Sequence, residues 1–345
     1  MKNTLAALAL ALLVGAIGCG PKEDTTSGTT GSTSTTSGTE TKGGDAKKYR
    51  IAVIPKGSTH EFWKSVHAGA EEAGKELGVE VIWKGPMKED DRESQIKVVE
   101  DFVTNGVDGI VLAPLDAVAL RGPVQQAQRS DIPVLIIDSG LDEVETVSFV
   151  ATDNKKGGEM AGDEVAKLLG GKGKVIMLRY QEGSASTMQR EEGFMEAMKK
   201  NPGITILSEN QHAGATVESA QSASENLLAR FKNPDGTLGV DGIFCPNESS
   251  TFGMLRVLQD NAWAGKVKFV GFDASTKLID GLKAGEINGL VVQNPFNMGY
   301  LGVKNMVAKL KGETVEPRID TGAVLVTKEN METPDVAKLI APPSQ

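Results

Sequence analysis

The chain has 345 residues and a formal net charge of −9. An acidic balance argues against a nucleic acid as the partner, because a phosphate backbone calls for a basic face on the protein. Aromatic residues make up only 5% of the chain, so no platform for stacking bases is indicated. The portion from about residue 48 to the end is long enough for two domains of ordinary size.

The first 19 residues are typical of a bacterial export signal. Lys2 supplies a positive start, and the segment 5–17 is almost wholly small or apolar. This run is too short to span a bilayer as a permanent helix. Small residues directly before Cys19 resemble a lipobox, and this resemblance implies that Cys19 is lipidated and becomes the first residue of a mature lipoprotein. Ordinary cleavage near Cys19, which leaves a free thiol, is the alternative.

Residues 20–47 form a predicted tether. They consist mostly of Thr, Ser and Gly, and such a segment has no apolar surface whose burial would offset the entropy of ordering it. A disordered spacer of this kind allows a folded domain to reach away from the membrane. The composition therefore supports the lipid anchor at Cys19.

Short apolar strands alternate with amphipathic helices from residue 50 to the end. Strands are expected at 51–55, 79–83, 109–113, 134–138, 147–151, 175–179, 204–208, 242–245, 267–272 and 289–293. Helices are expected at 62–77, 94–105, 159–169 and 188–199. This alternation predicts the α/β class, with parallel sheets covered by helices on both faces. Cys245, at the end of one apolar strand, is expected to be a buried core thiol.

An internal repeat predicts two similar lobes. The sequence Gly-Val-Asp-Gly-Ile occurs at 106–110 and again at 239–243. Pro114 follows the first copy and Pro246 the second, and each is followed by a helical pattern and an apolar strand. The first of these strands ends at Asp138 and the second at Asp273. The nearly constant spacing indicates equivalent units.

Polar side chains follow several of the predicted strands. In open parallel sheets, ligands bind beyond the carboxyl ends of the strands. The residues there are Lys56, His60, Asp138, Asn247, Asp273 and Gln293. Carboxylates accept hydrogen bonds from adjacent hydroxyls, and amide side chains both donate and accept. Nearby Phe62, Trp63 and Phe272 add flat apolar faces, so the pattern predicts a sugar site.

Over about residues 49–327 the chain resembles the periplasmic sugar-binding proteins of the ribose-binding type. The motifs that carry the resemblance are Ile51-Ala52-Val53-Ile54, Phe62-Trp63, Gly69-Ala70, Gly106-Val107-Asp108-Gly109-Ile110, Ile132-Pro133-Val134, Ala151-Thr152-Asp153-Asn154, Arg190, Gly193-Phe194, Asn247-Glu248, Gly271-Phe272-Asp273 and Val292-Gln293. The resemblance implies a type I periplasmic binding protein, in which two Rossmann-like lobes joined by a three-strand hinge close around the ligand. It implies an N-terminal lobe at 48–152 plus 294–322 and a C-terminal lobe at 153–293 plus 323–345.

The resemblance also implies which residues contact the ligand. They are Lys56, His60, Phe62, Trp63, Asp138, Thr152, Arg190, Asn247, Phe272, Asp273 and Gln293. Thr152 is expected at the first hinge as well as near the ligand. Three positions depart from the ribose pattern: Lys56 replaces a small hydroxyl residue, Ala113 an asparagine, and Ser139 the arginine expected beside Asp138. These changes leave the identity of the sugar open.

Each of these residues also has a simpler interpretation. Asp138 and Asp273 are both of the type that caps a following helix, and Arg190 has an acidic neighbour on its own helix in Glu191.

His60 could be a solvated loop residue, Trp63 a core residue that packs its helix, and Lys56 a solvated lysine at a strand end. If Lys56, His60 and Arg190 do share the cleft, they make it cationic, which favours a ligand with a carboxylate or phosphate as an alternative to a neutral sugar. Asp138 and Asp273 oppose such an anion.

Other classes of function are less well supported. No zinc helix, P-loop or nucleophile elbow is present in the sequence, so we expect neither catalysis nor a cofactor or metal. A repressor of this fold would begin with a DNA-binding helix-turn-helix, and here a signal segment and tether take that place. The sequence predicts a monomeric solute-binding protein, periplasmic or on the cell surface, that delivers a small sugar or polyol to an ABC permease. A sensor that presents the sugar to a chemoreceptor or sensor kinase remains the alternative.

Overall fold

The structure, a computed structural model, describes residues 48–341. The predicted signal segment, Cys19 and the predicted tether lie outside the described residues, as do the last four residues of the chain. In the described part of the chain, no helix is long and apolar enough to cross a membrane.

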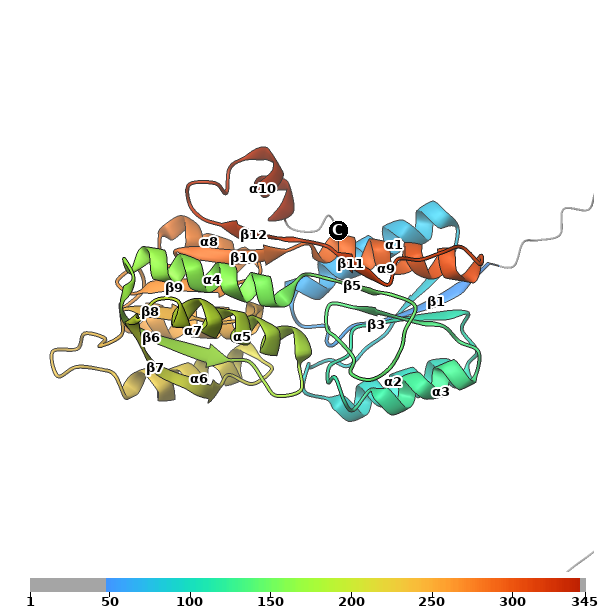
Figure 1. Ribbon diagram of the computed structural model, residues 1–345, viewed down its shortest axis with the longest axis horizontal. Coiled ribbons are helices and arrows are strands. Elements are labelled where there is room, and N and C mark those ends of the chain that lie inside the picture. The colour runs from blue at the N-terminus through green and yellow to red at the C-terminus, as the bar shows by residue number, and fades with distance from the viewer. Residues whose placement is uncertain (1–47, 342–345) are drawn as a thin grey trace, which may run out of the picture. The chain divides into compact units, whose positions relative to one another are not determined.

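The described residues form two six-stranded sheets (Figure 1). The first contains β1 (Arg50–Ile54), β2 (Glu80–Trp83), β3 (Gly109–Leu112), β4 (Val134–Ile137), β5 (Phe149–Ala151) and β11 (Arg318–Asp320) in the order β11-β5-β4-β3-β1-β2. The second contains β6 (Lys172–Arg179), β7 (Gly203–His212), β8 (Gly242–Phe244), β9 (Lys268–Phe272), β10 (Gly289–Gln293) and β12 (Ala323–Val326) in the order β12-β10-β9-β8-β6-β7. Every pairing is parallel except that of β12 with β10 at the edge of the second sheet. The predicted α/β class with two Rossmann-like lobes is confirmed.

Helices cover both faces of each sheet. In the first lobe, α1 (Glu61–Leu77) and α9 (Pro295–Leu310) pack on one face, and α2 (Arg92–Thr104) and α3 (Arg121–Arg129) pack on the other. In the second lobe, α4 (Asn154–Leu168) and α5 (Ala185–Lys199) cover one face. The opposite face carries α6 (Val217–Ala229), α7 (Glu248–Asp260), α8 (Thr276–Ala284) and α10 (Pro334–Leu339). Because both faces of each sheet are covered, the strands are apolar throughout, which is the pattern seen in the sequence.

The repeated Gly-Val-Asp-Gly-Ile motif occupies the same place in both lobes. Each copy leads into the central strand of its sheet, β3 or β8, beside the first strand of that lobe. Asp108 accepts a hydrogen bond from the Arg50 N–H at 2.8 Å, and Asp241 accepts one from the Lys174 N–H at 2.7 Å. In return, the backbone N–H of Asp108 donates to the Arg50 carbonyl, and that of Asp241 donates to the Lys174 carbonyl. The repeated aspartate thus ties two neighbouring strands together at their amino ends.

The chain passes between the sheets three times: between β5 and α4, between β10 and α9, and between β11 and β12. Hydrogen bonds join the first of these crossings to the third. The Thr152 hydroxyl donates to the Gly322 carbonyl at 3.2 Å, and the Asp153 N–H donates to Asp320 Oδ1 at 3.2 Å. Thr152 therefore lies at a crossing, as expected.

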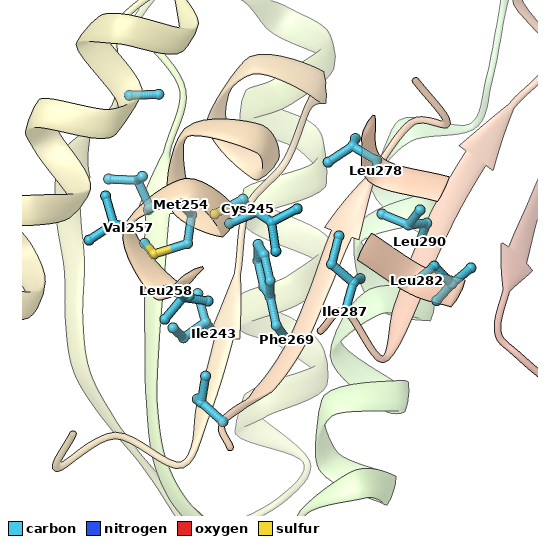
Figure 2. Packing of buried hydrophobic residues seen from close by; sticks show 14 of the residues in the cluster. Ile243, Cys245, Met254, Val257, Leu258, Phe269, Leu278, Leu282, Ile287 and Leu290 are labelled. Atoms are coloured by element: carbon cyan, nitrogen blue, oxygen red, sulfur yellow. The ribbon is translucent and has the colours of Figure 1, made fainter. Parts of the chain in front are cut away.

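One of the two core clusters of the second lobe packs on the α6, α7 and α8 side of its sheet (Figure 2). Phe269 lies among the aliphatic side chains of β8, α7 and α8, and Cys245 is buried with them. The expected core thiol is confirmed. The helix predicted at 159–169 begins earlier, at Asn154, because the Asp153 side chain accepts a hydrogen bond from the Lys156 N–H and caps it.

Candidate functional site

A polar cavity lies between the two lobes, at the carboxyl ends of strands from both sheets. Its empty volume is about 310 Å³ when the solvent space at its mouth is included. It is lined by Lys56, His60, Phe62, Trp63, Glu89, Asp138, Ser186, Thr187, Arg190, Asn247, Glu248, Asp273 and Gln293. The structure brings together all the residues predicted from the sequence except Thr152 and Phe272.

Asp138 and Asp273 occupy equivalent positions in the two lobes. Each directly follows a strand, β4 or β9, and each has a left-handed backbone conformation, with φ of 62° and 72°. The N–H of Asp138 donates to the Val150 carbonyl, and that of Asp273 donates to the Val291 carbonyl on the next strand. The left-handed conformation is uncommon for residues other than glycine, and aspartate is one of the types that tolerate it.

Neither aspartate caps the helix that next follows it. Asp153 and Ser275 are the N-cap residues of α4 and α8. The simple capping interpretation of Asp138 and Asp273 is therefore wrong, and both carboxylates are buried at the cavity instead.

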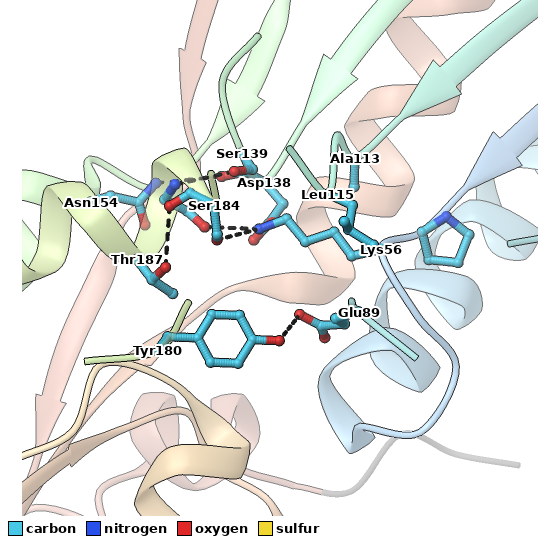
Figure 3. A network of polar contacts seen from close by, with 12 residues as sticks. Lys56, Glu89, Ala113, Leu115, Asp138, Ser139, Asn154, Tyr180, Ser184 and Thr187 are labelled. Carbon is cyan, nitrogen blue, oxygen red and sulfur yellow. Dashed lines mark hydrogen bonds and ion pairs between the residues drawn. The ribbon is translucent and has the colours of Figure 1, made fainter. Parts of the chain in front are cut away.

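Lys56 forms an ion pair with Asp138 inside the site. Its Nζ lies 3.0 Å from Asp138 Oδ2 and donates hydrogen bonds to the hydroxyls of Ser184, at 3.2 Å, and Ser186, at 3.0 Å (Figure 3). The lysine is only 3% exposed, so the interpretation of Lys56 as a solvated residue is wrong. Because the two serines belong to the second lobe, the ammonium group also connects the lobes.

His60 and Trp63 share one buried acceptor, Glu89. His60 Nδ1 lies against Glu89 Oε1, and Trp63 Nε1 donates to the same oxygen at 2.7 Å. Tyr180, from the second lobe, donates its hydroxyl to Glu89 Oε2 at 2.8 Å (Figure 3). Trp63 both packs in the core beneath α1 and lines the cavity. His60 is buried, so the interpretation of His60 as a solvated loop residue is wrong.

Both members of this pair are held in their charged forms. Burial alone would lower the pKa of His60, but the Glu89 carboxylate outweighs it and raises that pKa to about 9. Burial likewise would raise the pKa of Glu89, and His60 opposes this and lowers it to about 2. The site therefore presents an imidazolium, whose two nitrogens both donate hydrogen bonds.

The Arg190 guanidinium donates its hydrogen bonds to groups of the second lobe. It donates to Asn154 Oδ1 at 2.8 Å, the Pro246 carbonyl at 3.0 Å and Gln293 Oε1 at 2.8 Å. The interpretation of Arg190 as a partner of Glu191 is wrong.

Glu191 instead accepts hydrogen bonds from Arg179 Nε and the Tyr180 N–H. Phe272 does not line the cavity, because its ring lies 4.1 Å beneath the Arg190 guanidinium and is fully buried. Its cation–π contact supports the arginine from behind.

The backbone that carries Arg190 is positioned by glycines in the packing of α4 against α5. A Cβ atom at Gly158 would lie 1.9 Å from the Arg190 carbonyl oxygen, and one at Gly193 would lie 2.0 Å from the Lys155 carbonyl oxygen. Only glycine permits this close approach of the two helices. The packing of α4 against α5 therefore fixes the segment of α5 that brings Arg190 to the cavity.

Asp273 accepts two hydrogen bonds within its own lobe. Gln293 Nε2 donates to its Oδ1 at 2.8 Å, and the Glu248 N–H donates to its Oδ2 at 2.9 Å. Asn247 caps α7 through its side chain, which accepts from the Ser250 N–H, so it faces the cavity from the start of that helix. Burial raises the pKa of Asp273, and it raises that of Glu248 to about 7.

Sequence reasoning missed Glu89, Ser186, Thr187 and Glu248 in the lining. Glu89 lies in the loop after β2, several residues beyond the strand end, and Ser186 and Thr187 lie in the first turn of α5. Glu248 directly follows Asn247 near the carboxyl edge of the sheet, and this position in the sequence could have predicted its place in the lining.

Two of the departures from the ribose pattern lie outside this lining. The Ala113 carbonyl accepts a hydrogen bond from Gln95 Nε2, and the Ser139 hydroxyl accepts one from the Ser186 N–H at 3.1 Å.

Carboxyl groups offset every cation of the cavity lining. The cations of the lining are Lys56, His60 and Arg190, and the carboxyl groups are Glu89, Asp138, Glu248 and Asp273. Two cations are in direct ion pairs, with Asp138 and Glu89. The third, Arg190, reaches Asp273 through the shared amide of Gln293. No excess of positive charge is left in this lining to favour an anion.

Two equivalent α/β lobes, joined by three crossings and enclosing a polar cavity lined from both sides, define a bilobal solute-binding protein. The periplasmic binding protein domain model matches residues 51–314, and the chain belongs to this family, in its ribose-binding type. The ribose import binding protein RbsB of Haemophilus influenzae is 30% identical over 81% of this chain and 91% of its own length.

Solved structures give the same assignment. A carbohydrate transporter solute-binding protein from Agrobacterium radiobacter, in complex with D-arabinose, is 36% identical, with a TM-score of 0.81 over 86% of this chain and 99% of that chain. An ABC transporter solute-binding protein from Agrobacterium vitis with bound D-fucose is 34% identical, with a TM-score of 0.80 over 85% of this chain and 100% of that chain. These matches extend over both lobes.

Proposed function

We propose that this protein captures a small neutral sugar or polyol between its two lobes outside the inner membrane and delivers it to an ABC import permease. The observation that carries the proposal is the pair of equivalent carboxylates, Asp138 and Asp273, that face one enclosed cavity from opposite lobes. A ligand with hydroxyl groups on both sides of a ring bridges them and stabilises the closed form. Relatives that bind D-arabinose and D-fucose support a monosaccharide as the ligand.

The charge balance supports a neutral ligand over an anionic one. Lys56, His60 and Arg190 led to the sugar-acid alternative, but their partners Asp138, Glu89 and Asp273 offset them within the site. An added carboxylate or phosphate on the ligand would meet these buried acids without a free cation. Such a ligand would lose its hydration and gain no compensating pair.

Delivery for import is favoured over sensing, because relatives include a ribose import binding protein and transporter solute-binding proteins. Binding without chemical conversion is also part of the proposal. His60 is held by Glu89 and Lys56 by Asp138 and two serines, so these groups serve to orient hydroxyls.

The proposal extends to the location and organisation of the chain. A signal segment at 1–19, lipidation at Cys19 and a tether at 20–47 would hold the protein at the membrane, where the permease lies. The proposed lobes are 48–152 plus 294–322 and 153–293 plus 323–345, and the protein acts as a monomer. The family of periplasmic binding proteins to which the chain belongs supports the periplasmic setting.

Thermal-shift measurements on the whole chain test the proposal, with a panel of pentoses, hexoses, polyols and the matching sugar acids. A bound ligand raises the apparent Tm, and the rise grows with the logarithm of its concentration over its Kd. We expect at least one neutral sugar or polyol to raise the Tm and its acid form to have little effect. A response to the acid alone would overturn the neutral-ligand assignment, and no response to any of these compounds would overturn sugar capture.

A further inference from the structure

Two glutamates connect the lobes beside the cavity, each at the first residue of a helix. Glu61 begins α1 in the first lobe, and its Oε2 accepts hydrogen bonds from the Thr276 N–H, at 2.9 Å, and the Thr276 hydroxyl, at 3.0 Å. Thr276 begins α8 in the second lobe. The carboxylate of one lobe thus sits on the N-terminus of a helix in the other.

The reverse contact is made by Glu248, which begins α7 in the second lobe. Its Oε1 accepts a hydrogen bond from the Glu61 N–H at 3.1 Å, and its Oε2 accepts one from the Phe62 N–H at 3.0 Å. These two N–H groups belong to the first turn of α1. The two glutamates therefore make a reciprocal contact. Glu61 caps α8 and Glu248 caps α1, in each case across the gap between the lobes.

The chemistry of these contacts favours the closed arrangement. The first N–H groups of a helix have no acceptor within the helix, and they lie at the positive end of its dipole. The Glu61 carboxylate makes charge-assisted hydrogen bonds there, which are stronger than neutral ones. Every one of these bonds joins residues of different lobes, so all of them break when the lobes separate.

The reciprocal contact is also connected to the ligand cavity. The Glu248 N–H donates to Asp273 Oδ2, and the first turn of α1 directly follows His60 and contains Phe62 and Trp63. All of these side chains line the cavity. Closing the contact therefore places the cavity-lining groups of both lobes in register.

We propose that Glu61 and Glu248 are positioning residues that hold the lobes closed, and that they thereby set how long a captured ligand stays bound. The inference rests on the proposed function of ligand capture by closing lobes. Glu61 is not one of the residues that line the ligand cavity, so its side chain contributes through the position of the lobes.

Stopped-flow binding of a sugar that the thermal-shift panel identifies tests the proposal. We expect Glu61→Ala to raise koff about tenfold, which corresponds to about 1.4 kcal/mol. Its kon should stay within about twofold, because the ligand enters the open form, in which the contact is absent. Glu93→Ala and Glu218→Ala are matched controls: each is an exposed acid in the first turn of a helix, α2 or α6, and each should leave koff unchanged. An unchanged koff in Glu61→Ala would overturn the proposal.

A second measurement needs no ligand. The Ala117 N–H donates to the Gly183 carbonyl across the lobes at 2.9 Å, away from both glutamates, so its hydrogen exchange reports lobe opening. Glu61→Ala should speed exchange at Ala117 several-fold with the controls at the wild-type rate. Equal exchange in Glu61→Ala and the wild type would show that the reciprocal contact does not hold the lobes closed. If the wild type binds no sugar, the proposed function fails, whereas this exchange result still decides whether the glutamates hold the lobes together.

Discussion

Asp138 and Asp273 are equivalent residues of two similar lobes, and they line the same cavity from opposite sides. Both follow a central strand, both have a left-handed backbone, and each N–H donates to the neighbouring strand. Their partners differ, because Asp138 pairs with Lys56, whereas Asp273 accepts from Gln293 and the Glu248 N–H. The same backbone conformation therefore presents two different carboxylates. Asp138 is neutralised by a cation, whereas Asp273 accepts hydrogen bonds from neutral donors.

Replacing Asp273 with alanine should weaken sugar binding. The change removes a charged acceptor and leaves the Gln293 amide and the Glu248 N–H without a partner, and a hydrogen bond to a charged group contributes about 1.5–3 kcal/mol. We expect the Kd to rise by roughly tenfold to a hundredfold. Isothermal titration calorimetry measures this, with Asp280→Ala, an exposed acid on α8 in the same lobe, as the control. An unchanged Kd would show that Asp273 is not a ligand contact.

Replacing Lys56 with methionine should destabilise the protein. The methionine has a similar length but leaves the buried Asp138 carboxylate without its cation. Removing one partner of a buried ion pair typically costs about 3–5 kcal/mol. Urea unfolding of the whole chain measures the loss, and Lys64→Met, on the exposed side of α1, is the control.

The double variant Lys56→Met with Asp138→Asn should recover part of that stability, because it removes the uncompensated charge. If the double variant is less stable than Lys56→Met by the full cost of a second, independent change, the ion pair does not explain the loss.

The His60–Glu89 pair should stabilise the fold in a defined pH window. The pKa of Glu89 falls from 4.5 to about 2, so its contribution is present above pH 4.5 and is lost as the pH falls toward 2. The pKa of His60 rises from 6.5 to about 9, so its contribution is present below pH 6.5 and is lost as the pH rises through 9. We therefore expect the pair to contribute fully between about pH 4.5 and 6.5.

In Glu89→Gln that contribution should disappear, and the pKa of His60 should fall, because burial then dominates it. NMR titration of the His60 ring measures the second effect, with the half-exposed His67 as an internal control. A His60 that titrates at the same pH in both proteins would contradict the assignment.

Sugar affinity should increase as the pH falls from 8 to 6. Burial in the closed form raises the pKa of Glu248 from 4.5 to about 7, against the pull of His60 and with a small addition from Asp273. Opening the lobes exposes this carboxyl group and returns its pKa toward 4.5, so the closed form binds protons more tightly than the open form. Closure then takes up a proton, and acid favours it.

Calorimetry in buffers of different ionisation enthalpy measures the proton uptake directly. Glu248→Gln should remove most of the uptake near pH 7 and flatten the pH dependence of Kd between 6 and 8. Uptake that persists undiminished in Glu248→Gln would assign the proton to another group.

Much of the fold could be predicted from local patterns. The apolar strands required sheets covered on both faces, and the repeat of Gly-Val-Asp-Gly-Ile at 106–110 and 239–243 required two similar lobes. The start of α4 was misplaced, because Asp153 caps the helix ahead of its apolar stripe. The short edge strands β11 and β12 have no clear period and are held by their neighbours in the sheets.

The site was only partly predictable. Residues directly after strands, such as Asp138 and Gln293, were found because the carboxyl edge of a parallel sheet is a general binding edge. Glu89 was missed, since its role comes from contacts with His60, Trp63 and Tyr180, which lie far from it in the chain. Phe272 was placed in the lining but lies behind Arg190, and no strand pattern distinguishes these two positions.

The sequence by itself determined the two-lobed α/β architecture and the row of polar groups at the strand ends, because periodicity and repeats are properties of neighbouring residues. The charge state of the site was decided only by the tertiary structure. Lys56, His60 and Arg190 suggested a cationic cleft in the sequence, but folding brings Asp138, Glu89 and Asp273 to them and balances the charges. Buried charges must be matched by partners in space. Those partners lie far apart in the sequence, and only folding brings them together.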